Sequence, residues 1–281
     1  MKIRFVKMHG AGNDFVMIDD RDGTFPAEKA TLAAIGTRGT GVGCEGIILV
    51  QQSQSADFRM RFFNPDGSEA EMCGNGARCV AAFAREIGAA LSDTMRFETI
   101  AGLVEAEIIP QPQPSTSQPL NLSTSQLVKI ALPDPKDLRS DFVNSGVPHK
   151  IVPVEDLEHA DVDGEGRRIR YSDEFAPAGT NVDFVRYRPP HDADIRTYER
   201  GVEAESGACG TGSVAAAVVG VAQYGLSFPV AVHTVRGFEL TIDGESDGKS
   251  FRSVSLTGPV ARVFDGEIDL DSLDRTVADR R

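Results

Sequence analysis

Cysteine is scarce in this sequence, and the few cysteines present are not grouped. Only Cys44, Cys73, Cys79 and Cys209 occur in 281 residues. Their spacing matches neither a CxxC redox motif nor the knuckle spacing of a structural zinc site. The pattern therefore predicts free thiols in a reducing compartment.

Basic residues are in the minority. Lys and Arg number 29 against 42 Asp and Glu, which gives a formal net charge of −13. Nucleic acids and anionic membrane surfaces are bound by concentrated Lys and Arg, so this balance argues against both classes of partner. We expect a small-molecule substrate, with any anion bound by a local group of residues.

A long apolar segment is also missing. The start, MKIRFVKMHG, carries basic residues and no apolar core, so we expect no secretory signal and a cytoplasmic protein. Residues 206–235 lack Asp, Glu, Lys and Arg, but their longest apolar run, VAAAVVGVA at 214–222, is too short to span a bilayer. That stretch predicts a buried helix.

What the sequence does contain is typical of a soluble, strand-rich protein. It is 41% hydrophobic and 25% charged, and its length favours two domains. Alternating apolar and polar residues predict extensive antiparallel sheet. The predicted strands are residues 2–8, 14–19, 46–52, 58–63, 95–100, 104–109, 128–132, 149–154, 182–188, 194–199, 230–235, 238–242 and 253–258.

Two alanine-rich segments, residues 73–88 and 209–225, predict helices instead. Each opens with Cys-Gly-x-Gly and ends in a glycine suited to the position after a helix. The second segment has no charged residue, so we expect it to be buried on all sides and wrapped by sheet.

An internal repeat links these two segments. GSEAEMCGNG at 67–76 and GVEAESGACGTG at 201–212 share Gly, Glu-Ala-Glu and Cys-Gly-x-Gly in the same order. We therefore predict related domains: residues 1–127 with Cys73, completed by residues 259–281, and residues 128–258 with Cys209. The stretch LTGPVARVFDGEIDL at 256–270 predicts one more strand with a turn. The Pro-, Ser-, Thr- and Gln-rich stretch 110–126 predicts an exposed low-complexity loop at their junction.

Cys73 and Cys209 are the candidate catalytic residues. A helix N-terminus presents unpaired N–H groups and a partial positive charge, which favour a thiolate and an anion beside it. One thiol as general base and the other as general acid could invert an α-carbon without a cofactor, while the helix N–H groups hold the carboxylate. Free cysteine is often just a small buried residue, and we apply that interpretation to Cys44 and Cys79.

Three long motifs make the sequence similar to the diaminopimelate epimerase family. They are MHGAGNDFVMID at 8–19, FNPDGSEAEMCGNGAR at 63–78 and YERGVEAESGACGTGS at 198–213. The resemblance implies an α+β fold of two pseudo-symmetric domains, each a mostly antiparallel sheet or barrel wrapped around a central helix. It also implies a homodimeric isomerase of lysine and peptidoglycan precursor synthesis that interconverts LL- and meso-diaminopimelate without pyridoxal phosphate or any other cofactor.

The resemblance also implies roles for individual residues. Cys73 and Cys209 match the catalytic thiols, and His149 matches a histidine near the second of them. Glu199 and Arg200 match residues near the substrate amino group and the distal carboxylate. The remaining matches are backbone donors to the α-carboxylate (Gly74, Asn75, Gly210, Thr211) and asparagines that line the pocket (Asn13, Asn64, Asn181).

Two departures and two alternatives remain. Many family members have Asn where this chain has Val147, and some have Gln where it has Gly46, which affects recognition of the distal end.

A proline or hydroxyproline racemase of the same fold would share the thiol pair, but a compact ring leaves Arg200 without a partner. A thiol redox switch is a different class of function, and the lack of adjacent cysteines argues against it.

Overall fold

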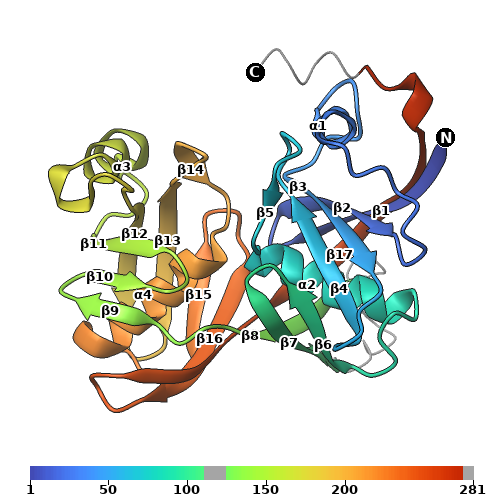
Figure 1. Cartoon of the computed structure of the whole chain (residues 1–281). Helices are drawn as coiled ribbons and strands as arrows, with labels where there is room; N and C mark the ends of the chain where they lie inside the picture. The colour runs from blue at the N-terminus through green and yellow to red at the C-terminus, as the bar shows by residue number, and fades with distance from the viewer. Residues whose placement is uncertain (111–124, 275–281) are drawn as a thin grey trace, which may run out of the picture. The chain divides into compact units, whose positions relative to one another are not determined.

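The computed structural model describes residues 1–110 and 125–274, and its contacts divide the chain into two compact units (Figure 1). Unit 1 is Met1–Ile130 with Pro259–Arg281, and unit 2 is Ala131–Gly258. The first boundary lies three residues after the predicted one, because strand β8 (Ser125–Ala131) runs through it. Of the predicted loop 110–126, residues 111–124 lie outside the described residues, and the last two belong to β8.

Unit 1 is a closed barrel of eight strands around helix α2 (Gly74–Glu86). The barrel helix contacts β1, β2, β3, β4 and β7, and it is buried from Asn75 to Ala84. Helix α1 (Lys29–Gly36) connects β2 to β3, and β5 (Glu69–Ala70) leads into α2. The barrel strands, in order around it, are β1 (Lys2–Gly10), β2 (Asn13–Asp19), β3 (Gly46–Gln51), β4 (Phe58–Phe63), β6 (Thr94–Thr99), β7 (Gly102–Ile109), β8 and β17 (Phe251–Asp269).

Unit 2 repeats this plan around helix α4 (Gly210–Gln223). The helix contacts β10, β11, β12, β13, β15 and β16, and every residue from Gly212 to Gly220 is buried, as the absence of charge predicts. Helix α3 (Val162–Arg170) connects β11 to β12. The strands are β9 (Lys136–Arg139), β10 (Phe142–Asn144), β11 (Pro148–Pro153), β12 (Asn181–Arg188), β13 (Asp192–Glu199), β14 (Ala204–Ser206), β15 (Val230–Thr234) and β16 (Glu239–Ser246).

The pairing of strands confirms the predicted pseudo-symmetry. In unit 1, β2 runs parallel to β3, β3 and β4 are antiparallel, β5 pairs with β4, and after α2 the chain returns parallel to β4 as β6. In unit 2, β11, β12, β13, β14, α4 and β15 follow the same sequence of pairings. The repeated Glu-Ala-Glu and Cys-Gly-x-Gly strings therefore occupy the same place in both units.

The ends of both central helices follow the predicted capping. Cys73 and Cys209 are the N-cap residues of α2 and α4. Gly88 and Gly225, one residue past each C-cap, have φ angles of 69° and 73°, a left-handed conformation that glycine adopts without a steric penalty. Both thiols are thus placed at the first turn of a buried helix.

One expectation about secondary structure was wrong, and two helices were missed. No turn interrupts residues 256–269: they belong to β17, a strand of 19 residues that pairs with β16 in unit 2 and then with β1 in unit 1. Helices α1 and α3 were not predicted, because α1 has only eight residues and α3 contains two glycines, which oppose helix formation. Among the described helices, none has the length and apolar character needed to cross a membrane.

The barrel core of unit 1 offers a test of this packing. Phe58 on β4 is fully buried and stacks on Phe97 of β6, with ring centroids 4.9 Å apart. We expect Phe58→Ala to lower the free energy of unfolding by about 3–5 kcal/mol, because it leaves a cavity. The measurement is urea unfolding, with Leu91→Ala, at a residue 85% exposed, as a control expected to stay within about 0.5 kcal/mol. An unchanged midpoint for Phe58→Ala would contradict the assigned core.

Candidate active site

In unit 1 the Cys73 thiol lies in a network of side-chain amides. Cys73 Sγ is 3.7 Å from Asn13 Oδ1, to which it donates, and the same oxygen accepts from Asn75 Nδ2 at 3.2 Å. Asn13 comes from the first position of β2 and Asn75 from the first turn of α2. The structure therefore brings three of the predicted residues of unit 1 together around one oxygen atom.

A buried arginine fixes the direction of this network. Arg78 is fully buried on α2, and its Nη2 donates to Asn75 Oδ1 at 2.8 Å. At the other end, Asn13 Nδ2 donates to the Glu45 carboxylate. A guanidinium can only donate and a carboxylate can only accept, so both amides have one possible orientation, and Asn13 turns its oxygen toward Cys73.

Arg78 is unusual because it is buried without a carboxylate partner among the described residues. Its Nε has no hydrogen-bond partner there, and burial lowers the pKa of its guanidinium to about 10, while the Cys79 and Cys73 sulfurs act in the opposite direction. With that pKa the group stays positively charged at neutral pH. A positive charge thus lies beneath the first turn of α2, where a thiolate or a substrate carboxylate would benefit from it.

Asn64 occupies a different setting. It follows β4, and its side-chain amide donates to Ser68 Oγ at 3.1 Å while its backbone N–H donates to Ser68 O at 2.8 Å. These contacts hold the turn that leads to β5. Asn64 therefore shapes the approach to α2, and its contacts with Ser68 do not join the network around Cys73.

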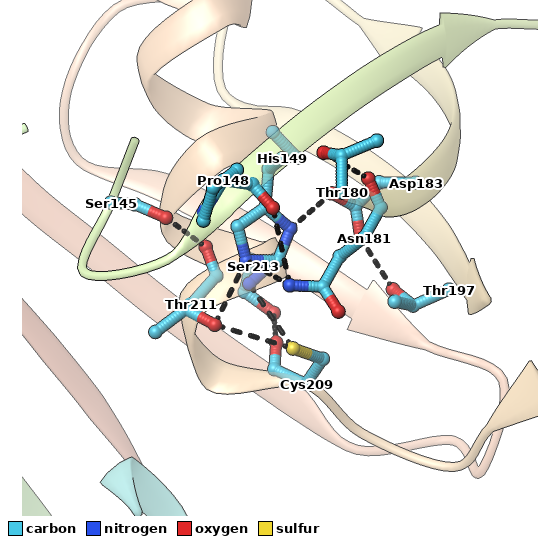
Figure 2. A network of polar contacts seen from close by, with 12 residues as sticks. Ser145, Pro148, His149, Thr180, Asn181, Asp183, Thr197, Cys209, Thr211 and Ser213 are labelled. Carbon is cyan, nitrogen blue, oxygen red and sulfur yellow. Dashed lines mark hydrogen bonds and ion pairs between the residues drawn. The ribbon is translucent and has the colours of Figure 1, made fainter. Parts of the chain in front are cut away.

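In unit 2 the Cys209 thiol begins a longer polar network (Figure 2). Cys209 Sγ accepts from Gly212 N–H at 3.4 Å and lies 3.4 Å from Thr211 Oγ1. Thr211 Oγ1 is 2.9 Å from His149 Nε2, and His149 Nδ1 is 2.6 Å from Asp183 Oδ2. His149 and Asp183 are both fully buried, on the neighbouring parallel strands β11 and β12.

Burial, and then the nearby carboxylates, favour the protonated form of the Cys209 thiol. Burial raises its pKa well above the usual value, the carboxylates of Glu199 and Asp183 add to this shift, and the hydrogen bonds from Thr211 and Gly212 oppose it. Ionisation of Cys209 therefore requires a neighbouring group that takes the proton and carries the positive charge.

Asn181 and Arg200 adjoin this network. The backbone N–H of Arg200 donates to Asn181 Oδ1 at 2.8 Å, and Asn181 Nδ2 donates to Pro148 O at 3.2 Å. The Arg200 guanidinium lies 3.5 Å from the carbonyl oxygens of Ala178 and Gly179. Within the described part of the chain, it meets no carboxylate.

Gly46 and Val147, the two departures from the family pattern, have different surroundings. A Cβ atom added at Gly46 would lie 2.4 Å from the ring of Phe62 and 3.0 Å from that of Phe15. No side chain fits there, because the two aromatic rings fill the space. Val147 is half-buried just before β11, and its carbonyl accepts from Ser145 N–H.

Three charged residues of the two networks were not predicted: Arg78, Glu45 and Asp183. For two of them the sequence carried a signal. Arg78 is a charged residue inside an alanine-rich helix, and Asp183 is a carboxylate inside the apolar strand NVDFV. A charge placed within a buried element is rare unless it is paired or functional. Glu45 stands in a glycine-rich loop, where an exposed acid would be ordinary.

Unit 1 also contains a pocket of about 500 Å³ at a distance in sequence from these residues. It is lined by residues of β1, β2, α2 and β17, among them Arg4, Phe5, Phe83 and Arg262, and by none of the predicted site residues.

Among the described residues, no cluster of three or more His, Cys, Asp or Glu side chains could hold a metal ion.

Comparisons with known proteins agree on one family. A family model described as diaminopimelate epimerase matches residues 5–118 and 142–263. The diaminopimelate epimerase of Aquifex aeolicus is 42% identical over 284 residues, covering 97% of this chain and all of that protein. That of Archaeoglobus fulgidus is 38% identical, covering 97% of this chain and 99% of that protein.

Solved structures share the fold at lower identity. A phenazine biosynthesis protein of the PhzF family from Bacillus anthracis superposes with a TM-score of 0.70 at 17% identity, covering 96% of this chain and 99% of that one. A probable proline racemase from Agrobacterium radiobacter gives 0.68 at 16% identity, covering 98% and 95%. At these identities the likeness concerns the fold alone.

The four cysteines should differ in reactivity. Burial raises the pKa of Cys44 to about 11 and that of Cys79 further, so both thiols stay protonated at pH 8. We expect iodoacetamide to modify the half-buried Cys73 and, as the pH is raised, Cys209, while Cys44 and Cys79 react only after unfolding. Peptide mapping by mass spectrometry, with and without urea at about 8 M, shows which cysteines are modified in the native and the unfolded protein. Modification of Cys79 in the native protein would contradict the assigned burial.

Proposed function

The chain belongs to the diaminopimelate epimerase family, and we propose that Cys73 and Cys209 are the two thiols with which it inverts the α-carbon of diaminopimelate. The protein is an isomerase, and its reaction interconverts the LL and meso forms of the substrate. The observation that carries the assignment of residues is the placement of both thiols as N-caps of buried, pseudo-symmetric helices. Lysine and peptidoglycan precursor synthesis in the cytoplasm is the setting that this reaction implies.

The helix N-termini support binding of the α-carboxylate. The N–H groups of Gly74 and Asn75 in unit 1, and those of Gly210 and Thr211 in unit 2, lie in the first turns of α2 and α4. When the α-proton leaves, negative charge spreads onto the carboxylate. Oriented N–H groups stabilise that charge more strongly in the transition state than in the ground state.

The thiols would divide the proton transfers between them. In the proposed step, a thiolate takes the α-proton from one face, and the other thiol donates its proton to the opposite face. One sulfur gains the proton that the other has lost, so the pair must be re-equilibrated after each turnover. Because activity needs one ionised and one protonated thiol, the pH profile of the rate has two limbs.

The distal end of the substrate has candidate partners in unit 2. Arg200 carries a guanidinium with no carboxylate partner among the described residues, and its planar fork suits the distal carboxylate. Glu199 acts on Cys209 through its charge, which is consistent with a position near the substrate amino group. We propose that Asn13, Asn64 and Asn181 bind the non-reacting end of the substrate.

The two alternatives have less support. Proline racemases resemble this chain only in fold, at 16% identity for the example above, whereas diaminopimelate epimerases match it at up to 42% in the comparisons above. All four cysteines are free, so no disulfide supports a redox switch. Both alternatives remain distinguishable by experiment, since a racemase acts on L-proline and a switch responds to oxidants.

Single thiol variants test the proposed mechanism. We expect Cys73→Ala and Cys209→Ala each to lower the rate of meso product formation from LL-diaminopimelate by at least about 10³-fold, since each removes a proton donor or acceptor. Nuclear magnetic resonance in deuterated water follows both α-hydrogen loss and product formation. Cys44→Ala is the matched control and should stay near the wild-type rate.

The same assay separates the alternatives. L-proline should show no exchange, and addition of reductant should preserve activity. Near-normal epimerisation by either catalytic-thiol variant would refute the two-base mechanism, and exchange with L-proline at a comparable rate would favour the racemase.

We further propose that the chain forms a homodimer through the surface of unit 1 around Phe264. Val263 and Phe264 on β17 are 54% and 47% exposed, and Phe264 packs edge-on against Phe5, with ring centroids 6.0 Å apart. Phe5 also lines the pocket of about 500 Å³. Adjacent exposed hydrophobic side chains beside a hollow are typical of a surface that another protein covers.

A charge at Phe264 tests the proposed interface. We expect Phe264→Asp to convert a dimer into a monomer in sedimentation velocity, because a carboxylate in an apolar contact loses its hydration. Leu91→Asp, at another exposed leucine of unit 1, should leave the dimer intact. A wild-type protein that sediments as a monomer, or a Phe264→Asp variant that remains dimeric, would remove this surface from consideration.

A further inference from the structure

Asp183 carries a buried carboxylate that has no role in the proton transfers between the two thiols and the substrate. Its Oδ2 lies 2.6 Å from His149 Nδ1, and its Oδ1 accepts from Thr197 Oγ1 at 2.7 Å (Figure 2). A Cβ atom added at Gly212 would lie 2.6 Å from Asp183 Oδ1, so the carboxylate rests against the first turn of α4. Two donors and the positive end of a helix allow it to remain charged while fully buried.

The hydrogen-bond partners of His149 determine which of its ring nitrogens carries the proton. The backbone N–H of Arg200 can only donate, so Asn181 turns Oδ1 toward Arg200 and Nδ2 toward His149 Nε2, at 3.4 Å. Asn181 Nδ2 also donates to Pro148 O, which fixes the same orientation. Because Nε2 faces an amide donor, it must be an acceptor, and the ring proton is on Nδ1, from which it is donated to Asp183.

We propose that Asp183 is a positioning residue that holds His149 in this tautomer, so that Cys209 can transfer its proton through Thr211 to His149. Cys209 S–H donates to Thr211 Oγ1, and Thr211 O–H donates to His149 Nε2. This extends the proposed function and rests on Cys209 being a catalytic thiol. The carboxylate does not touch substrate, and it acts through the imidazole.

The transfer balances in protons and charge. The S–H bond of Cys209 breaks as an O–H bond forms on Thr211, and the original O–H bond of Thr211 breaks as an N–H bond forms on His149. A neutral thiol and a neutral imidazole become a thiolate and an imidazolium, and the imidazolium faces the Asp183 carboxylate. The Cys209 thiolate then takes the α-proton of the substrate while Cys73 donates its own, which leaves an imidazolium at His149 and a thiolate at Cys73. The imidazolium loses its proton to water and the Cys73 thiolate takes a proton from water, which restores both groups before the next turnover.

This relay gives the Cys209 thiol a group that takes its proton despite the carboxylates nearby. The groups that face it are Asp183 on β12, Glu199 at the end of β13 and His149 on β11, together with the N-terminus of α4. The two carboxylates oppose ionisation of the thiol while His149 is neutral. They favour it once the proton has reached the imidazole, because the imidazolium then pairs with Asp183.

The tautomer provides a test that does not depend on activity. In wild-type protein labelled with ¹⁵N-histidine, the two-bond ¹H–¹⁵N spectrum at high pH should show His149 protonated on Nδ1, with its signals assigned by their loss in His149→Asn. In Asp183→Asn we expect this preference to be lost, because the carboxylate that accepts the proton of Nδ1 is gone. Asp156→Asn, which alters the exposed Asp156–His159 pair, is the matched control and should leave His149 unchanged.

Kinetics then test the relay itself. We expect Asp183→Asn to lower kcat for epimerisation by at least about 10²-fold with little change in KM, since the substrate does not touch Asp183. Thr211→Val keeps the backbone N–H and the volume but removes the hydroxyl. It should keep the His149 tautomer and still lower kcat, and it serves as the second variant should Asp183→Asn fail to fold.

Two results would overturn the inference. One is a wild-type His149 that carries its proton on Nε2, and the other is a kcat for Thr211→Val or folded Asp183→Asn within about threefold of wild type, far below the expected contribution of proton transfer. If the proposed function were wrong, the Cys209→Ala variant would remain active, whatever the spectrum of His149 shows.

Discussion

A sulfur atom at the N-terminus of a buried helix is the constraint on which the rest of this structure depends. The N–H groups of the first turn and the helix dipole act on that sulfur only if the helix end is kept out of bulk water. Helices α2 and α4, of 13 and 14 residues, meet this condition because the strands around them bury their residues from Asn75 to Ala84 and from Gly212 to Gly220. The barrel of unit 1 and the sheet of unit 2 are thus the shells that each helix needs.

The two pseudo-symmetric units each provide a thiol at a helix N-terminus, but different side chains contact the two thiols. In unit 1 the thiol donates to Asn13, in a chain of amides whose direction is set by Arg78 and Glu45. In unit 2 the corresponding chain runs through Thr211 to His149. An amide holds a thiol in place but does not exchange protons near neutral pH, whereas an imidazole does. The same backbone therefore presents one thiol near a buried arginine and one near a buried histidine.

Much of the fold could be predicted from local patterns. Alternation located the longer strands because one face of each is buried, but it missed the short strands β5, β9, β10 and β14. The capping residues located both central helices because cysteine and glycine occupy special positions at their ends. Helix α1 escaped prediction because it has only eight residues, and α3 because it contains two glycines that oppose helix formation. The turn expected within residues 256–270 did not form, because this stretch pairs as part of β17 first with β16 and then with β1, with one shift of register between Lys7 and Met8.

The sequence by itself determined where the thiols lie and that they occur as a related pair, because capping and repetition are local properties of the chain. It also determined the family, through three long motifs. Only the tertiary structure decided which side chains act on each sulfur, because Asn13, Asp183 and His149 reach the helix ends from strands 26 to 60 residues away. Hydrogen-bond direction, and with it the tautomer of His149 and the orientation of Asn13, depends on those distant partners, and no periodicity along the chain encodes it.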